Sequence, residues 1–367
     1  MIDFGTSLAS FRAGGAESSE LAMDFLGGRP DVSRYVLGRN QHALACIKWT
    51  PIDGLVDDFY PQNSTWNGHP VIRPDSLPRG AIVINCSMSI RPVSAHARLA
   101  GIDGVRVLSY ADLVRADPGF PLPDFVATFR SDYVQNESKW RFLESSLSDR
   151  RSFSVLDNLV LYRLTGDYGH MAGFSVRFNE QYFDPIVPLS DEEVFVDCGG
   201  FDGDTVLEFC SRNPKYRQIY LFEPSPSNFE RARERLQGFE NLWLIPMGVS
   251  DVRGTLAFDP SAGSASSVSA AGSMTIDVVS IDEYVSQPVS FIKMDLEGWE
   301  LQALKGAQRH ILEDHPKLAI SVYHHASDFW RIPEYVLGLR GDYSVYLRHY
   351  SEGWSETVMY FIPHATA

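Results

Sequence analysis

This chain of 367 residues has few cysteines, few basic residues relative to acidic ones, and no long apolar run. The four cysteines, Cys46, Cys86, Cys198 and Cys210, show no C-x-x-C spacing, which favours a reduced compartment over a disulfide framework or a zinc site. The net charge of −15 and the lack of long Lys/Arg runs argue against a nucleic-acid partner. No apolar run approaches the roughly 20 residues of a membrane helix, and the N-terminus lacks a signal-peptide pattern. We therefore expect a soluble, cytoplasmic protein with no membrane insertion.

Strands and helices alternate in two separate stretches, which is typical of parallel α/β sheets. We predict a tail or docking segment over residues 1–30 and a small Rossmann-like α/β domain over 31–120. A helical connecting segment over 121–180 begins at the proline-rich "DPGFPLP". A second α/β domain over 181–367 closes with the antiparallel pair "DYSVYLRHY" and "ETVMYFIP". Within it, the small polar residues 259–274 predict a flexible loop, with a lid over a ligand as the alternative.

The stretch "VFVDCGGFDGDT" (194–205) reads as a strand that ends in a glycine turn. A P-loop is excluded because no lysine follows Gly203. A dinucleotide fingerprint would place Phe201 or Asp204 where glycines belong, and the acidic side chains would repel a pyrophosphate. S-adenosylmethionine (SAM) is cationic at sulfur and carries no phosphate, so the pattern D-x-G-x-x-x-G formed by Asp197, Gly199 and Gly203 favours SAM.

Glu223 stands at the end of the next predicted strand, "QIYLFE", where a carboxylate can accept hydrogen bonds from both ribose hydroxyls. The adenosine of NAD would use such an acid in the same way. These residues therefore favour SAM and leave NAD as the alternative.

Five motifs in order, "VDCGGFDGDT", "FEPSPSNF", "FIKMDLEGWELQALKGA", "PKLAISVYH" and "YLRHY" with "ETVMY", resemble the FkbM family of SAM-dependent O-methyltransferases over about residues 180–363. The resemblance implies a class I methyltransferase fold, a mostly parallel sheet with an antiparallel terminal strand. It also implies methyl transfer to a hydroxyl of a sugar or polyketide-like acceptor. One departure is Gly200-Phe201-Asp202, where many members have Ala-Asn-Ile, and it puts the subgroup in doubt.

The N-terminal stretch resembles, more weakly, the small Rossmann-like domains of nucleotide-sugar-modifying enzymes, through "YVLGRN", "GLVDDF" and "GHPVI". Its turn has only Gly38 and lacks a dinucleotide fingerprint. A structural domain, or one that forms a homo-oligomer, is the alternative.

Catalytic groups should lie at the carboxyl ends of the strands, where open α/β sheets bind ligands. Asp295 and Glu297 follow the strand "SFIKMD" and are predicted to shape the reaction pocket, unless they only cap the next helix. His324 in "SVYHH" is the predicted general base, with His325 and His349 as alternatives. Asp295, Glu297 and His324 could also hold Mg²⁺, but nothing in their spacing requires a metal, and we predict none.

The turn and the strand ends define the expected cofactor site. Met247 and Gly248 are expected beside the adenine, with Ser250 or Asp251 nearby. Tyr182 and Phe183 could cover the sulfonium or belong to the core. The predicted cofactor-binding residues are Asp197, Gly199, Gly203, Asp204, Thr205, Glu223, Pro224, Met247, Gly248 and Asp295.

The sequence thus predicts a SAM-dependent O-methyltransferase that acts on a hydroxyl of a sugar or another glycan or secondary-metabolite acceptor. Two alternatives stay open at this point. One is an NAD-dependent oxidoreductase of nucleotide sugars, and the other is a non-catalytic protein that uses a methyltransferase fold to bind a carbohydrate or a partner.

Overall fold

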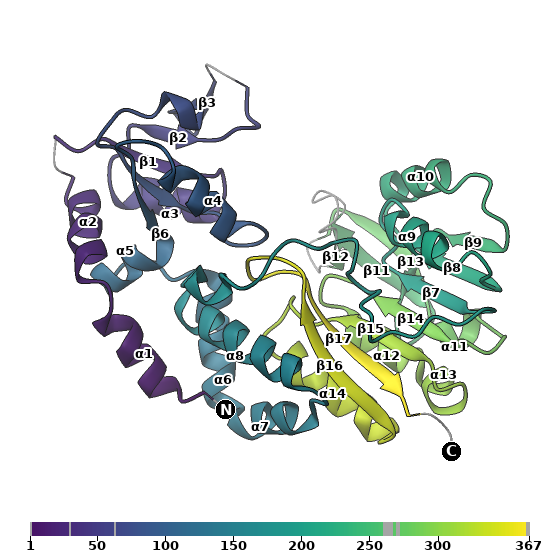
Figure 1. The fold of residues 1–367 in the computed structure, drawn as a ribbon. Coiled ribbons are helices and arrows are strands. Elements are labelled where there is room, and N and C mark those ends of the chain that lie inside the picture. Colours follow the sequence, from purple (N-terminus) through teal and green to yellow (C-terminus); the bar gives the residue numbers. More distant parts are fainter. Residues whose placement is uncertain (1, 29–30, 62–63, 260–266, 269–271, 365–367) are drawn as a thin grey trace. The chain divides into compact units, whose positions relative to one another are not determined.

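The computed structural model describes residues 2–28, 31–61, 64–259, 267–268 and 272–364, and the chain divides into two compact units (Figure 1). The N-terminal unit comprises residues 1–137, 154–176 and 350–355. The C-terminal unit comprises residues 138–153, 177–349 and 356–367. In the described part of the chain, no helix has both the length and the apolar composition needed to cross a membrane.

The N-terminal unit is built on a six-stranded sheet in the order β3-β4-β2-β1-β5-β6. All neighbouring strands are parallel except the short β3, so the predicted parallel α/β sheet is confirmed. The strands are β1 (Arg34–Leu37), β2 (Gly54–Val56), β3 (Thr65–Trp66), β4 (His69–Ile72), β5 (Ile82–Asn85) and β6 (Arg106–Ser109). The helices in this part of the chain are α1 (Phe4–Ala13), α2 (Ala16–Leu26), α3 (Gln41–Trp49), α4 (Pro92–Ala100) and α5 (Tyr110–Ala116).

Helices cover both faces of this sheet because its strands are apolar on both sides. Ile82 and Ile84 of β5 pack into a core that includes residues of α2, α3 and α5. Val83 between them packs into a second core with Leu99 of α4. The sulfurs of Cys46 and Cys86 lie 3.8 Å apart in the first core, and all four cysteines are free and buried.

Three helices follow where the sequence predicts a helical segment. They are α6 (Asp124–Gln135), α7 (Glu137–Ser146) and α8 (Arg150–Thr165). Trp140 and Leu143 of α7 are buried, as are Val126 and Phe129 of α6. The apolar spacing that predicts these helices is therefore also the spacing of their buried faces.

The C-terminal unit contains a seven-stranded sheet in the order β16-β17-β15-β14-β7-β8-β9. Strand β17 runs antiparallel to both neighbours and the remaining pairs are parallel, which confirms the predicted class I methyltransferase arrangement. Strands β7, β14 and β15 are buried along their whole length, as parallel strands covered on both faces should be. The strands are β7 (Val194–Cys198), β8 (Gln218–Phe222), β9 (Leu242–Ile245), β14 (Phe291–Met294), β15 (Lys317–Ser321), β16 (Tyr343–His349) and β17 (Thr357–Pro363).

A second small sheet, in the order β10-β13-β11-β12, was not expected. The predicted strand "LWLIPMG" divides, because β9 ends at Ile245 and β10 (Gly248–Val249) joins the small sheet. The predicted flexible loop over 259–274 is flanked by the paired strands β11 (Gly254–Asp259) and β13 (Met274–Val279), and contains β12 (Ser267–Val268). Residues 260–266 and 269–271, on which the lid alternative depends, lie outside the described residues. The α-helices that follow β7 in the described part of the chain are α9 (Asp204–Arg212), α10 (Pro226–Arg235), α11 (Ile281–Tyr284), α12 (Glu300–Lys305), α13 (Gln308–Glu313) and α14 (Asp328–Leu339).

Candidate active site

The order of the seven-stranded sheet reverses between β7 and β14. The chain proceeds outward from β7 through β8 to β9, and then returns to add β14 on the other side of β7. Open α/β sheets bind ligands in the crevice outside the carboxyl ends of the strands at such a point. The segments that follow β7, β8, β14 and β15 are therefore the place to look for a site.

The glycine turn after β7 has a conformation that side chains would obstruct. Gly199 and Gly203 have φ angles of 80° and 85°, in the left-handed region that favours glycine. A β-carbon on Gly199 would lie 2.0 Å from the carbonyl oxygen of Asp295, and one on Gly200 would lie 2.3 Å from Leu221 Cγ. The turn thus brings the backbone after β7 directly against the backbone after β14.

Helix α9 starts immediately after this turn, with Gly203 as its N-cap. The predicted cofactor residues Asp204 and Thr205 are its first two residues. Asp204 is exposed, and its Oδ1 accepts a hydrogen bond from the Thr205 backbone N–H at 2.8 Å. Both residues therefore lie at the rim of the turn.

Asp197 at the end of β7 is fully buried and faces a lysine that we did not predict. Its Oδ1 lies 3.0 Å from Lys293 Nζ, and Lys293 also donates a hydrogen bond to the Gly199 carbonyl at 2.7 Å. Burial raises the pKa of Asp197 to about 6, although the charge of Lys293 opposes that change. Oδ1 therefore has Lys293 as its partner, whereas Oδ2 accepts no hydrogen bond from a described residue.

The other acids of the turn are less available than the sequence suggests. Asp202 forms an ion pair with Arg235 of α10, with 2.6 Å between Oδ1 and Nη1. Phe201, with a φ of 45°, lies 5.0 Å from the guanidinium carbon of Arg231. Two acids of the turn, Asp197 and Asp202, therefore already have a protein cation beside them, and the turn attracts a cationic ligand less strongly than three free carboxylates would.

Glu223 connects the end of β8 to the glycine turn. It is buried, and it accepts hydrogen bonds from the backbone N–H groups of Phe201 at 2.9 Å and Ser225 at 2.8 Å. Burial raises the pKa of Glu223 to about 7, and these hydrogen bonds oppose the rise. An ionised carboxylate has about four acceptor positions, so Glu223 keeps room for further donors. Pro224 follows it and is partly exposed.

The predicted adenine-side residues lie where the chain passes from β9 to the small sheet. Met247 is partly exposed, and Gly248 begins β10. Ser250 Oγ accepts a hydrogen bond from Trp299 Nε1 at 3.2 Å and donates one to Asp251 at 3.0 Å. Trp299 thereby connects the segment after β10, which contains Ser250, to the loop after β14.

Asp295 and Glu297 lie in the loop between β14 and α12. Helix α12 begins at Glu300 with Trp299 as its N-cap, so Asp295 and Glu297 do not cap it. Glu297 has a φ of 53°. The loop is held by Glu300, whose Oε1 accepts hydrogen bonds from the backbone N–H groups of Leu296 at 2.8 Å and Gly298 at 3.3 Å.

His324 follows β15 and lies among three carboxylates. Its Nε2 is 3.5 Å from Asp295 Oδ1 and 3.3 Å from Glu297 Oε2, and its Nδ1 is 3.0 Å from Glu300 Oε1. Burial lowers the pKa of His324, but the carboxylates, Glu300 foremost, raise it well above its ordinary value. The surrounding carboxylates therefore favour the protonated ring.

Of the two alternative histidines, His325 lies against the loop after β14, because a β-carbon on Gly298 would be 2.2 Å from His325 Cε1. The side chain of His325 is 60% exposed, and its Nδ1 is 3.2 Å from Asp328 at the start of α14. His349 is buried at the end of β16, where Nδ1 lies 2.9 Å from Thr357 Oγ1. Phe183 belongs to an aromatic core with Phe195, Phe209 and Phe291.

Tyr182 contacts Asp295 in the group of acidic residues around His324, and so do residues that the sequence analysis does not identify. Its hydroxyl donates to Asp295 Oδ2 at 2.6 Å, and Tyr323 donates to Oδ1 at 3.4 Å. Burial, followed by the charge of Asp295, raises the pKa of Glu356 to about 7. Lys293 and Glu300 were visible as charged residues in "FIKMDLEGWE", whereas no spacing pointed to Tyr323 or Glu356.

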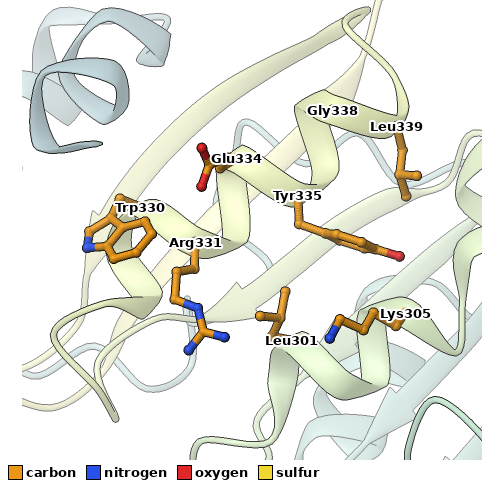
Figure 2. A pocket seen from close by; sticks show the side chains of 8 residues that line it. All are labelled: Leu301, Lys305, Trp330, Arg331, Glu334, Tyr335, Gly338 and Leu339. Carbon is orange, nitrogen blue, oxygen red and sulfur yellow. The ribbon is translucent and has the colours of Figure 1, made fainter. Parts of the chain in front are cut away.

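A separate groove of about 470 Å³ lies between α12 and α14 (Figure 2). Leu301 and Lys305 of α12 face Trp330, Arg331 and Tyr335 of α14 across it. The predicted site residues all belong to the described part of the chain, and none of them lines this groove. It is distinct from the site at the strand ends.

Known proteins that are similar to the C-terminal unit are methyltransferases. Residues 197–350 match the model of the methyltransferase FkbM domain. The hexuronic acid methyltransferase AglP of Haloferax volcanii is 30% identical over 162 residues, which are 37% of this chain and 66% of that protein. The chain therefore spans just under two thirds of the length of that relative.

One solved structure is similar over nearly the whole chain. The crystal structure of methyltransferase FkbM from Methylobacillus flagellatus KT has 25% sequence identity and a TM-score of 0.71, covering 98% of this chain and 100% of that chain. These similar proteins do not relate the N-terminal unit to nucleotide-sugar-modifying enzymes, and that resemblance stays a prediction.

Proposed function

Because the C-terminal half of this chain contains an FkbM-family methyltransferase domain of the SAM-dependent class, we propose that the protein transfers a methyl group from SAM to a hydroxyl of a sugar or a related acceptor. One observation carries the proposal: the glycine turn after β7 is hydrogen-bonded to Glu223 at the end of β8, beside the acid–histidine cluster after β14 and β15. The sugar acceptor is supported by the name of the Haloferax relative, a hexuronic acid methyltransferase.

The residues of the turn fit the polar groups of SAM. Glu223 has acceptor positions left for the two ribose hydroxyls. Asp197 Oδ2, which accepts no hydrogen bond from a described residue, is our candidate partner for the α-ammonium group. SAM, when bound, supplies an electrophilic methyl carbon on a sulfonium. Asp204, Thr205, Pro224, Met247 and Gly248 complete the proposed cofactor site.

The reaction requires that the acceptor hydroxyl lose a proton as its oxygen bonds to the methyl carbon, while the electrons of the broken carbon–sulfur bond stay on sulfur. We assign proton removal to the pocket formed by Asp295, Glu297 and His324. Positioning and water exclusion lower the barrier, and a general base adds about 10²–10⁴-fold. His324 is our candidate base, and it would act in this way only when its ring is neutral.

The proposal is tested by a methyl-transfer assay with SAM labelled in its methyl group and glycans that contain hexuronic acids or neutral sugars. We expect label in a base-stable methyl ether of one acceptor, and its loss in Glu223→Ala. Glu230→Ala on the exposed face of α10 is the matched control, because Glu230 pairs only with the nearby Arg233 among the contacts observed. SAM binding without transfer to any acceptor would favour the non-catalytic alternative.

A further inference from the structure

Three side chains after β14 and β15 converge on one point. Asp295, Glu297 and His324 each direct one potential ligand atom there, and these atoms lie within 4.8 Å of one another. The two carboxylates come from a single loop, in which Glu297 adopts a φ of 53°. That backbone conformation is unfavourable for a residue with a side chain, so the surrounding contacts must hold it.

The histidine provides a second, independent observation. The side chain of His324 is 7% exposed, and neither ring nitrogen makes a geometrically good hydrogen bond to a described residue. Its Nε2 faces Asp295 and Glu297, while Nδ1 lies 3.0 Å from Glu300. Histidines that bind metals usually direct the second nitrogen to a carboxylate, which fixes the ring and the tautomer. His324 has this arrangement, with Glu300 as the carboxylate.

Glu300 is itself fixed, as an orienting residue must be. Its side chain is 1% exposed, and its Oε1 accepts hydrogen bonds from the backbone N–H groups of Leu296 and Gly298. Those two residues flank Glu297. The buried carboxylate of Glu300 therefore fixes the position of the His324 ring and the conformation of the loop that carries Asp295 and Glu297.

The local charge also favours a cation. Asp295, Glu297, Glu300 and the partly buried Glu356 surround a single histidine, whereas Lys293 forms its ion pair with Asp197. A protonated His324 offsets one of these charges. A divalent cation would offset more of them and would leave His324 neutral.

We propose that Asp295, Glu297 and His324 bind one hard divalent cation, Mg²⁺ or Mn²⁺, and that Glu300 positions His324 for it. Two carboxylates and one imidazole suit these ions, which prefer about six ligands. About three positions therefore remain for water or for neighbouring hydroxyl groups of an acceptor. With the cation bound, His324 would be a ligand and not the base, and an acceptor hydroxyl on the cation would lose its proton to solvent. This catalytic part rests on the proposed function.

The test is a titration of the full-length protein with Mn²⁺, without SAM or acceptor, followed by calorimetry and by the electron paramagnetic resonance of free Mn²⁺. We expect one site, competition by Mg²⁺, and about tenfold or greater weakening in Glu297→Gln and His324→Ala. Glu300→Gln should weaken binding about 10-fold, as loss of an orienting carboxylate does elsewhere. Glu283→Gln, which removes an exposed carboxylate paired with Arg253, should change nothing.

Unaltered thermal unfolding and SAM binding of Glu297→Gln would show that this variant is folded. Absence of Mn²⁺ binding, or binding that Glu297→Gln and His324→Ala leave unchanged, would overturn the proposal. Methyl transfer that resists EDTA would overturn the catalytic part and leave the proposed function standing. Site-specific Mn²⁺ binding in a protein without methyl transfer would support the cation site and remove the proposed function.

Discussion

The two units contain similar parallel sheets, but they differ in whether the buried polar side chains at the strand ends are hydrogen-bonded within the protein. In the N-terminal unit Asn85, at the end of β5, is fully buried, donates to the Pro92 carbonyl and the Tyr168 hydroxyl, and accepts from Ser87 N–H. In the C-terminal unit Asp197 Oδ2 and both ring nitrogens of His324 lack such hydrogen bonds from described residues, and charged neighbours face the two side chains. A parallel sheet alone therefore does not make a site. The site lies where buried polar groups are left for a ligand.

The largest effect should come from closing the glycine turn. Gly199→Ala would place a β-carbon 2.0 Å from the Asp295 carbonyl at a φ of 80°, so the two loops must separate. We expect loss of SAM binding and about 3 kcal/mol or more of destabilisation, from overpacking and backbone strain. Calorimetric SAM titration and urea unfolding measure the two effects.

Gly254→Ala is the control, because a β-carbon at this position would have no other atom within 4 Å and the φ angle is not positive. Gly38→Ala, at a φ of 101° in the N-terminal unit, sharpens the comparison. It should lower stability and leave SAM affinity unchanged. An equal loss of SAM binding in Gly199→Ala and Gly38→Ala would break the distinction between the units.

The next effect should come from Lys293→Met, which leaves Asp197 buried without its partner. Removal of one member of a buried ion pair costs about 3–5 kcal/mol, and we expect a corresponding loss of stability in urea unfolding. The double variant Asp197→Asn with Lys293→Met should recover part of the stability that Lys293→Met loses. Lys215→Met, which breaks an exposed pair with Asp191, should cost less than about 1 kcal/mol. Equal effects of the two lysine substitutions would contradict this account.

A smaller effect is expected in the N-terminal unit. Asn85→Ala removes two donated hydrogen bonds and leaves buried acceptors, at a cost of about 1–3 kcal/mol. Thermal unfolding should show the loss, while SAM affinity should stay as in the wild type. Weaker SAM binding in Asn85→Ala would contradict the purely structural role that we assign to Asn85.

The smallest effect concerns pH. The pKa of Glu223 is about 7, and its ionised form is the one that accepts from ribose hydroxyls, so SAM affinity should rise up to about tenfold between pH 6 and pH 8. The same raised pKa stabilises the ligand-free protein at acidic pH, and this contribution is lost as pH rises toward 7. Calorimetry across this range, with Glu223→Gln as the variant that should lose the dependence, checks the sign.

The parts of the site that depend on local sequence could be predicted. The spacing of strands and turns predicts that Gly199 and Glu223 lie at the ends of successive strands, and the family resemblance implies the mostly parallel sheet. Contacts between residues far apart in the sequence could not be read in this way. Glu356 approaches Asp295 only because β17 is inserted between β15 and β16.

Three features of the C-terminal unit could not be predicted from the sequence, for physical reasons. The pairing of Asp202 with Arg235 could not be predicted, because Arg235 lies on a helix whose orientation the sequence does not specify. The position of Glu300 against the second nitrogen of His324 could not be predicted, because the sequence does not specify how the loop after β14 faces the end of β15. The paired strands β11 and β13 were missed because their connection is composed of small polar residues.

The most direct test is a calorimetric titration of SAM into wild-type protein, Glu223→Ala and Asn85→Ala. The account predicts one site per chain with micromolar-range affinity in the wild type, at least about tenfold weaker binding in Glu223→Ala, and unchanged binding in Asn85→Ala. No binding in the wild type, or equal affinity in the wild type and Glu223→Ala, would contradict the assignment of the crevice after β7 and β8 to SAM.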